Sequence, residues 1–194
     1  MKANVSAILL ALLGGTFASA DMISSEGLAP YEVCGLCHGL DGNSAMAKFP
    51  KLAGQKAAYI EKQLHDFRGG HRSNDGGQMQ AIVTELAEAD IPVVAAWFES
   101  QPAPLPVEGA ISASAAQNFT SLGCAGCHTA PNPPPGLTVP HITAQHPAYL
   151  ERQLKAFRDG DRQNDPEGVM RAVAAGLSDE AIAELAAYIA SLPR

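Results

Sequence analysis

The sequence predicts an all-α fold made of two similar halves. Pro50-Lys51-Leu52 recurs as Pro140-His141-Ile142, and further matching stretches follow at the same offset of 90 residues. Apolar residues recur at the spacing of a helix face, as Ile60, Leu64 and Phe67 do. No useful stretch alternates between apolar and polar residues as a strand would. A repeat of this length with helical periodicity indicates a tandem duplication of one helical domain.

Three helices are predicted in each half. The first ends in a cysteine pair and the second carries the apolar stripe. In the second half the third helix starts at Ser178, a favourable N-cap followed by two acidic residues, and stops at Pro193. The expected ranges are 26–38, 56–68 and 88–99 in the first half, and 112–127, 147–158 and 178–193 in the second.

The chain divides into four segments. Residues 1–20 combine a basic start, a short apolar run and Ala18-Ser19-Ala20. This pattern predicts a cleaved signal peptide, with an uncleaved anchor as the minor alternative. The proline-rich stretch 101–110 predicts a semi-rigid linker between an N-terminal domain at 21–100 and a C-terminal domain at 111–194. Each domain is small enough that a core made of protein alone is marginal.

The two halves each contain one Cys-x-x-Cys-His motif, Cys34-Gly35-Leu36-Cys37-His38 and Cys124-Ala125-Gly126-Cys127-His128. The motif is typical of c-type haem attachment. Two thiols one helical turn apart can each bind a haem vinyl group, and the next histidine can bind the iron. A redox dithiol or a zinc site would also use cysteine pairs, but neither explains the histidine after both pairs. We therefore expect two covalently bound haem c groups, with these residues as their ligands: Cys34, Cys37, His38, Cys124, Cys127 and His128.

Composition restricts the partners. Removal of residues 1–20 takes away one lysine, so 20 acidic residues face 12 Lys and Arg and the net charge is about −8. This charge argues against nucleic acid or an anionic membrane surface as partner. The 11 aromatic residues (6 Phe, 4 Tyr, 1 Trp) are few, so a large buried cofactor would supply much of the apolar volume. We expect no integral membrane span after signal cleavage.

A sixth iron ligand is needed if electrons are to pass without substrate binding at the iron. Met79 and Met170 occupy equivalent places, because the offset becomes 91 residues just before them. A buried methionine more often serves core packing, but its duplication here favours axial ligation. Met46 corresponds to Gly136, and Met22 precedes the first helix. Four histidines have no histidine counterpart and are expected on the surface: His65, His71, His141 and His146.

Other residues are candidates for contacts around the haems. The carbonyl of Pro50 or Pro140 would accept the Nδ1 hydrogen of the proximal histidine, although each proline could equally well just end a loop. Six polar side chains could reach haem propionates, or could serve only packing and solvation: Arg72, Arg162, Tyr59, Tyr149, Gln55 and Gln145.

The sequence resembles the dihaem cytochrome c4 family over essentially the whole mature chain. Besides the paired haem motifs and the two methionines, the resemblance rests on these stretches: Gly42-Asn43-Ser44, Phe49-Pro50-Lys51-Leu52-Ala53-Gly54-Gln55, Tyr59-x-x-x-Gln63-Leu64-x-x-Phe67, Asn74-Asp75, Asn164-Asp165 and Leu177-Ser178-Asp179-Glu180-x-Ile182-x-x-Leu185-Ala186-x-Tyr188. The resemblance implies two tandem class I cytochrome c domains related by a pseudo-twofold axis, with the haem propionate edges facing each other. It also implies that Pro50 and Pro140 hold the proximal histidines.

The second half departs from the family pattern in two places. Residues 129–138 are proline-rich where Gly-Asn-Ser would be expected, and Thr143-Ala144 replaces Ala-Gly. The surroundings of the second haem are therefore expected to differ from those of the first.

Three functions compete. The leading one, implied by the resemblance, is a non-enzymatic periplasmic electron carrier between a donor dehydrogenase or quinol-oxidising complex and an acceptor such as a terminal oxidase. The second is an electron-accepting subunit of a periplasmic, sulfur-oxidising, flavoprotein-type dehydrogenase. The third is a catalytic dihaem enzyme, a peroxidase or a thiosulfate dehydrogenase. Catalysis would require an open iron or an unusual ligand, whereas the sequence offers one methionine for each haem and has no spare cysteine.

Overall fold

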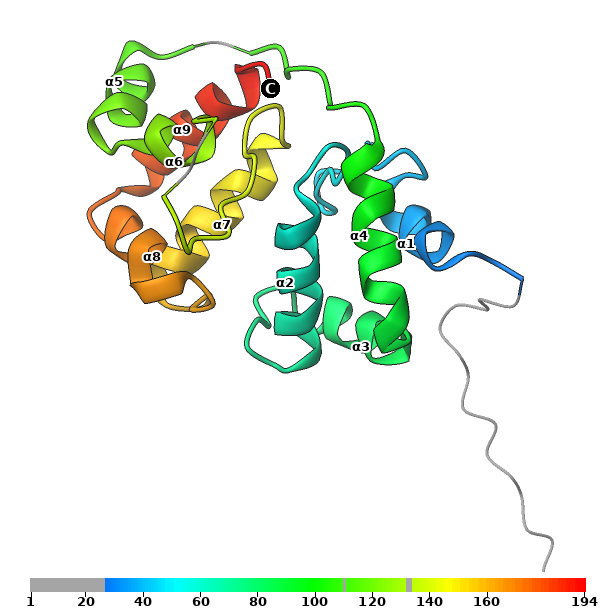
Figure 1. The fold of residues 1–194 in the computed structure, drawn as a ribbon. Coiled ribbons are helices and arrows are strands. Elements are labelled where there is room, and N and C mark those ends of the chain that lie inside the picture. Colours follow the sequence, from blue (N-terminus) through cyan, green and yellow to red (C-terminus); the bar gives the residue numbers. More distant parts are fainter. Residues whose placement is uncertain (1–26, 110, 132–133) are drawn as a thin grey trace, which may run out of the picture.

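The computed structural model describes residues 27–109, 111–131 and 134–194 (Figure 1). The expected signal peptide at 1–20 and Met22 lie outside these ranges. The described residues form helices and no strands, as the all-α prediction requires. The α-helices are α1 (Pro30–His38), α2 (Ala57–Arg68), α3 (Gln78–Glu85), α4 (Ile91–Ser100), α5 (Ala113–Ser121), α6 (Cys124–His128), α7 (Pro147–Asp159), α8 (Val169–Ala174) and α9 (Asp179–Ser191). Two 3₁₀ turns, η1 (Glu88–Asp90) and η2 (Pro166–Gly168), precede α4 and α8.

In the first half, α4 forms the centre of the core. Its residues Ile91, Val94 and Phe98 are almost fully buried. They are three and four positions apart and therefore share one helix face. This face packs against α2, whose Leu64 and Phe67 belong to the same apolar cluster, while α1 packs on α4 and α3 on α2.

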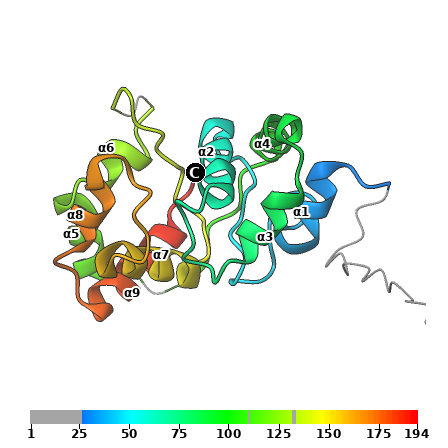
Figure 2. The same cartoon turned by 90° about the horizontal axis from the view of Figure 1, so that it is seen from below.

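In the second half, α9 has the same role. Ile182, Leu185 and Ile189 are buried and pack against α5 and α7. The helix begins where the sequence predicts, because the Ser178 hydroxyl accepts a hydrogen bond from Ala181 N at 3.2 Å. The extensive helix–helix packing lies within each half, and α2 and α7 lie on the inner sides in both views (Figure 2).

The helix that carries the haem motif differs between the halves. In the first half α1 is continuous. In the second half the helix expected at 112–127 is divided, since α5 ends at Ser121 and α6 begins at Cys124. Gly123 between them has a left-handed φ of 70°, a conformation that ends an α-helix. The prediction of one continuous helix there was wrong.

Two short helices were not predicted, and both carry a candidate methionine. Asp75 accepts a hydrogen bond from Met79 N at 2.6 Å in the first turn of α3, and Asp165 accepts one from Arg171 N at 3.0 Å in α8. These equivalent aspartates satisfy backbone donors at the helix starts. Both helices are too short for their apolar spacing to reveal them in the sequence.

Residues 101–109, in the segment expected to be the linker, contain no helix. Pro104 is buried, and Val107 N donates to Ala190 O at 2.9 Å, so this part of the linker is attached to the second half. The segment can be followed from α4 to α5 in Figure 1.

Candidate functional site

Both haem motifs open into one continuous cavity of about 750 Å³. All four cysteines line it, together with His38 and His128. Its remaining walls include apolar core side chains of both halves: Ile60, Leu64, Phe67, Val94, Phe98, Leu150, Leu154, Phe157, Leu185 and Ile189. A mostly apolar space bordered by two cysteine pairs suits a large, flat and largely apolar group in each half.

The two motif histidines have the same orientation. Nδ1 of His38 lies 2.8 Å from Pro50 O, and Nδ1 of His128 lies 2.9 Å from Pro140 O. Burial lowers the pKa of both rings, although each carbonyl contact acts in the opposite direction. A neutral ring that donates from Nδ1 keeps its lone pair on Nε2. Each half therefore presents an imidazole nitrogen that is ready to bind a metal.

The described residues do not gather the four cysteines into the shared zinc site considered from the sequence. All four cysteines are free, and the described residues contain no group of three or more His, Cys, Asp or Glu placed to hold a metal ion. Burial raises the pKa of Cys34 to about 11 and also raises the pKa of Cys124. The four-cysteine zinc site is therefore absent from the part of the chain described.

Met79 and Met170 both line the cavity and pack against the core of their own half. Met46 is 55% exposed and does not line the cavity. Each half thus brings one thioether and one histidine nitrogen to the same apolar space. These side chains fit a haem in each half, since thioether and imidazole are common axial ligands of electron-transfer haems.

The other histidines divide into two groups. His65 and His71 are exposed, as expected. His141 and His146 are half-buried between the halves, so their prediction as surface residues was wrong. His141 lines the cavity, and Nε2 of His146 lies 2.8 Å from Ser44 O of the other half. Their positions depend on the approach of the two halves, which the sequence pattern of one half does not reveal.

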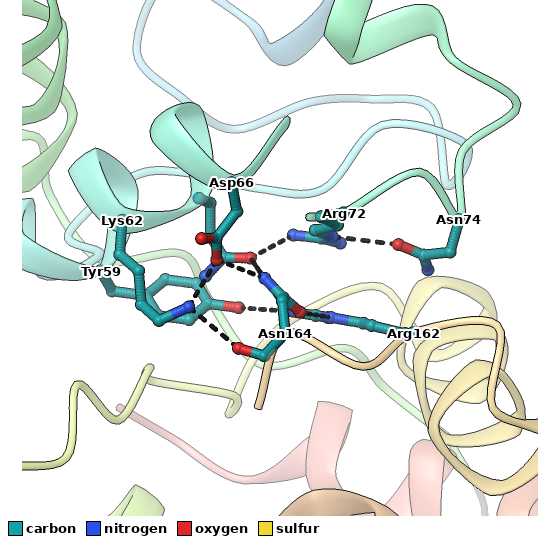
Figure 3. Close-up of polar contacts among 8 residues, drawn as sticks. Tyr59, Lys62, Asp66, Arg72, Asn74, Arg162 and Asn164 are labelled. Carbon is teal, nitrogen blue, oxygen red and sulfur yellow. Dashed lines mark hydrogen bonds and ion pairs between the residues drawn. The ribbon is translucent and has the colours of Figure 1, made fainter. Parts of the chain in front are cut away.

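Two buried arginines form a symmetric network at the boundary of the halves (Figure 3). Arg72 donates to four neutral side chains at 2.8–3.1 Å: Gln63, Asn74, Tyr149 and Gln153. Arg162 donates to the four equivalent side chains at 2.8–3.0 Å: Gln153, Asn164, Tyr59 and Gln63. Each set contains residues of both halves, so the contacts are exchanged about a pseudo-twofold axis.

The charges in this network suit an acidic group in the cavity. A buried guanidinium is favourable when an anion balances it, yet the hydrogen-bond partners of Arg72 and Arg162 are neutral. Burial by itself would raise the pKa of Tyr59, but the charges of Arg162 and Arg72 outweigh it and lower that pKa. Both arginines line the cavity. The carboxylates of a haem would supply the balancing charge here.

One part of the network is asymmetric. Lys62 Nζ lies 2.5 Å from Asp66 and donates to Asn164 O at 2.9 Å, and Asn164 Nδ2 donates to Asp66 at 2.6 Å (Figure 3). In the second half the equivalents of Lys62 and Asp66 are Arg152 and Ala156. Arg152 instead donates to carbonyls of residues 47 and 48.

Gln63 and Gln153 belong to the repeat but were not predicted as site residues, and the contacts of Lys62 and Asp66 were not predicted. A signal was available, because Tyr59 and Gln63 are four residues apart on one helix face and recur as Tyr149 and Gln153. Gln55 and Gln145 were predicted to contact haem propionates or to serve only packing and solvation. Both line the cavity, but their amide groups bind the backbone of the other half.

Known proteins resemble this chain over nearly its whole length. The cytochrome c family model matches residues 112–193. Cytochrome c4 of Pseudomonas aeruginosa is 36% identical over 206 residues, which cover 98% of each chain. A thiosulfate dehydrogenase electron acceptor of Stutzerimonas stutzeri is 34% identical over 98% of this chain and 93% of the relative.

A solved structure shares the fold. The crystal structure of reduced recombinant cytochrome c4 from Pseudomonas stutzeri superposes with a TM-score of 0.71 at 36% identity, covering 85% of this chain and 97% of the other. The fold is that of class I cytochromes c, and the matches extend across both halves. The chain therefore belongs to the cytochrome c4 family and carries two covalently bound haem c groups.

Proposed function

We propose that this dihaem electron-transfer cytochrome is a free periplasmic carrier whose two irons are both six-coordinate. His38 and Met79 would bind the iron attached through Cys34 and Cys37. The equivalent residues of the second half, His128 and Met170, would bind the iron attached through Cys124 and Cys127. The observation that carries the proposal is the repeated pairing of one histidine nitrogen and one thioether at the same apolar cavity.

The residues of the chain then have separate tasks. When bound, haem supplies a reversible one-electron couple. The apolar walls exclude water, and the methionine thioethers favour the reduced iron. Arg72 and Arg162 would balance the propionate charge at the boundary of the halves, and the hydroxyls of Tyr59 and Tyr149 would donate hydrogen bonds to it. Because both sites share one cavity, electrons can pass between them without leaving the protein interior.

The partners would be redox proteins. The expected donor is a dehydrogenase or a quinol-oxidising complex, and the expected acceptor is a terminal oxidase. The expected signal peptide at 1–20 supports a periplasmic location. None of the described helices has the length and apolar character needed to cross a membrane.

Carbon monoxide binding tests whether both irons are closed. The reduced holoprotein should bind no carbon monoxide at neutral pH, and it should show no turnover of peroxide or thiosulfate by itself. Rapid binding at one haem together with turnover would instead favour a catalytic dihaem enzyme.

A second candidate function is that of electron acceptor for a thiosulfate dehydrogenase, which is what one relative is named for. The two functions differ in their donor. The oxidised protein should be mixed with a quinol-oxidising complex in one experiment, and with a thiosulfate dehydrogenase plus thiosulfate in another. Haem reduction within milliseconds to seconds by only one donor would assign the partner. Co-purification with a flavoprotein would favour a permanent subunit.

A further inference from the structure

One peptide group connects each proximal histidine to the opposite half of the molecule. The Pro50 carbonyl faces His38 Nδ1 at 2.8 Å, and the N–H of the same peptide group, that of Lys51, donates to Gln145 Oε1 at 2.8 Å. The second half repeats this arrangement. The Pro140 carbonyl faces His128 Nδ1 at 2.9 Å, and His141 N donates to Gln55 Oε1 at 2.9 Å.

The two glutamine side chains are held firmly in these positions. Both are 4% exposed. Gln145 Nε2 donates to Lys51 O at 2.9 Å, and Gln55 Nε2 donates to His141 O at 2.8 Å. Each Oε1 also accepts the backbone N–H of the residue that follows its own glutamine, at 3.0 and 3.1 Å. The amide orientation is therefore determined by contacts on both of its polar atoms.

A hydrogen bond to one end of a peptide group affects the other end. Resonance links the N–H and the carbonyl, so an acceptor at the N–H increases the negative charge on the carbonyl oxygen. Such cooperativity strengthens a neighbouring hydrogen bond by roughly 10–30%. A stronger bond from Nδ1 makes the imidazole a better electron donor at Nε2, which favours ferric iron.

We propose that Gln145 and Gln55 are positioning residues that tune the proximal histidine of the opposite half. Gln145 acts on His38 through the Pro50–Lys51 peptide group, and Gln55 acts on His128 through the Pro140–His141 peptide group. The proposal rests on the proposed function, in which these histidines bind iron. Each half of the molecule thereby adjusts the haem of the other.

A role in holding the halves together is separable from this tuning. Other contacts across the boundary do not touch either peptide group. They include Arg72 with Tyr149, Arg162 with Tyr59, and Arg152 with the carbonyls of residues 47 and 48. Replacement of Arg152 therefore removes an interdomain contact and leaves the proline peptides intact.

The test compares the holoprotein with Gln145→Leu, Gln55→Leu and the matched control Arg152→Gln. The readouts are the NMR signals of the Nδ1 protons of His38 and His128 in the reduced protein, and the potential of each haem assigned through its methionine signals. In Gln145→Leu the His38 proton should move upfield and the potential of the first haem should rise. The His128 proton should not move. Gln55→Leu should give the converse, and Arg152→Gln should leave both proton signals in place.

Three outcomes decide between the possibilities. Equal movement of both histidine protons in each leucine variant would mean general loosening of the interface and would overturn the proposal. Unmoved protons in both variants would also overturn it and would leave the iron ligands as assigned. Absence of a ligated histidine or methionine signal from the unmodified protein would contradict the proposed function itself.

Gln145→Glu provides a second measurement if the leucine variant does not assemble. It keeps an acceptor for Lys51 N and loses the donor to Lys51 O. The His38 proton should stay in place or move downfield. An upfield shift in this variant would contradict tuning through the peptide group.

Discussion

The two halves agree in their histidine–proline and arginine contacts and differ in the helix that carries the haem motif. At the boundary, the histidine–proline contacts and the arginine contacts are repeated within about 0.1 Å. Away from it, α1 is continuous whereas its counterpart is broken at Gly123. The difference shows that the duplicated halves keep their paired arginine contacts, whereas the haem-motif helix and the contacts of Lys62 and Asp66 have diverged.

The loop after the haem motif illustrates this divergence. In the first half Gly42 O accepts backbone hydrogen bonds from Leu52 N and Ala53 N at 2.7 and 3.1 Å. Gly42 has a φ of 74°, and a Cβ there would lie 2.9 Å from Phe98 Cδ1. The loop is therefore fitted to the core. The corresponding loop is proline-rich, with residues 132–133 outside the described ranges.

The largest expected effect comes from exchanging the proposed axial ligands. Met79→His and Met170→His should each lower the potential of one haem by on the order of 0.1 V or more, because axial ligands set haem potentials over a range of about 0.8 V. Each variant should also remove half of the iron–thioether charge-transfer band of the ferric protein. Spectroelectrochemistry measures both quantities.

Met46→Leu is the control for that exchange, since Met46 is exposed and does not line the cavity. It should leave both potentials and the band nearly unchanged. If Met46→Leu removed the band while Met79→Leu kept it, the two halves would bind haem differently.

Core truncation should affect the first half more than the second. Phe98→Ala should decrease the free energy of unfolding by about 3–5 kcal/mol, and the equivalent Ile189→Ala by about 2–5 kcal/mol. The first value should be larger because Phe98 also supports the loop at Gly42. Denaturant unfolding of the holoproteins measures both. Val93→Ala, at a position 48% exposed, should stay within about 0.5 kcal/mol.

The Asp66 carboxylate, which has no counterpart in the second half, should contribute less to the free energy of unfolding. Asp66→Ala copies the second half, where Ala156 stands, and should decrease the free energy of unfolding by about 1–2 kcal/mol, because Asn164 and Lys62 lose a charged partner that is only partly exposed. Glu151→Ala breaks a more exposed pair with Lys155 and should change the free energy of unfolding by less than Asp66→Ala does. Equal losses in the two variants would show that Asp66 has no special role at the boundary.

The smallest expected effect is a dependence of stability on pH that arises from a histidine of the second half. Burial lowers the pKa of His146 below its ordinary value, the Ser44 carbonyl opposes this, and the charges of Lys51 and Arg152 add to it. As the pH falls below about 6.5, the unfolded chain binds a proton at this histidine before the folded protein does, so stability decreases. The equivalent position in the first half is Lys56.

His146→Lys should therefore reduce the loss of stability between about pH 7 and about pH 5. The change should be partial, because the pKa of His141 is lowered in the same way. Thermal unfolding across this range measures it. An unaltered pH dependence in His146→Lys would place the titrating group elsewhere.

The sequence predicted the features that depend on local pattern. The duplicated motifs, the stripe containing Leu64 and Phe67, and the N-cap at Ser178 are all signals within one segment, and the structure has the corresponding elements. The short helices α3 and α8 were not predicted, because about two helical turns show little apolar periodicity. The break between α5 and α6 at Gly123 was not predicted, because a single glycine is compatible with a helix interior.

Features that require both halves were harder to predict. The burial of His141 and His146 and the contacts of Gln55 and Gln145 arise only when the halves approach each other. No spacing rule within one half encodes such contacts. The repeat did identify the residues, because both glutamines occupy equivalent positions.

The exchanged glutamine contacts have a consequence for the origin of the two-domain chain. Each half holds both a glutamine and a peptide group that the other half's glutamine binds, which is the property of an isologous homodimer interface. The molecule is thus organised as a dimer whose two copies have been joined into one chain. A short linker such as that at 101–110 keeps the effective concentration of one half beside the other at roughly the millimolar level. Contacts too weak to pair separate chains can therefore hold these two halves together.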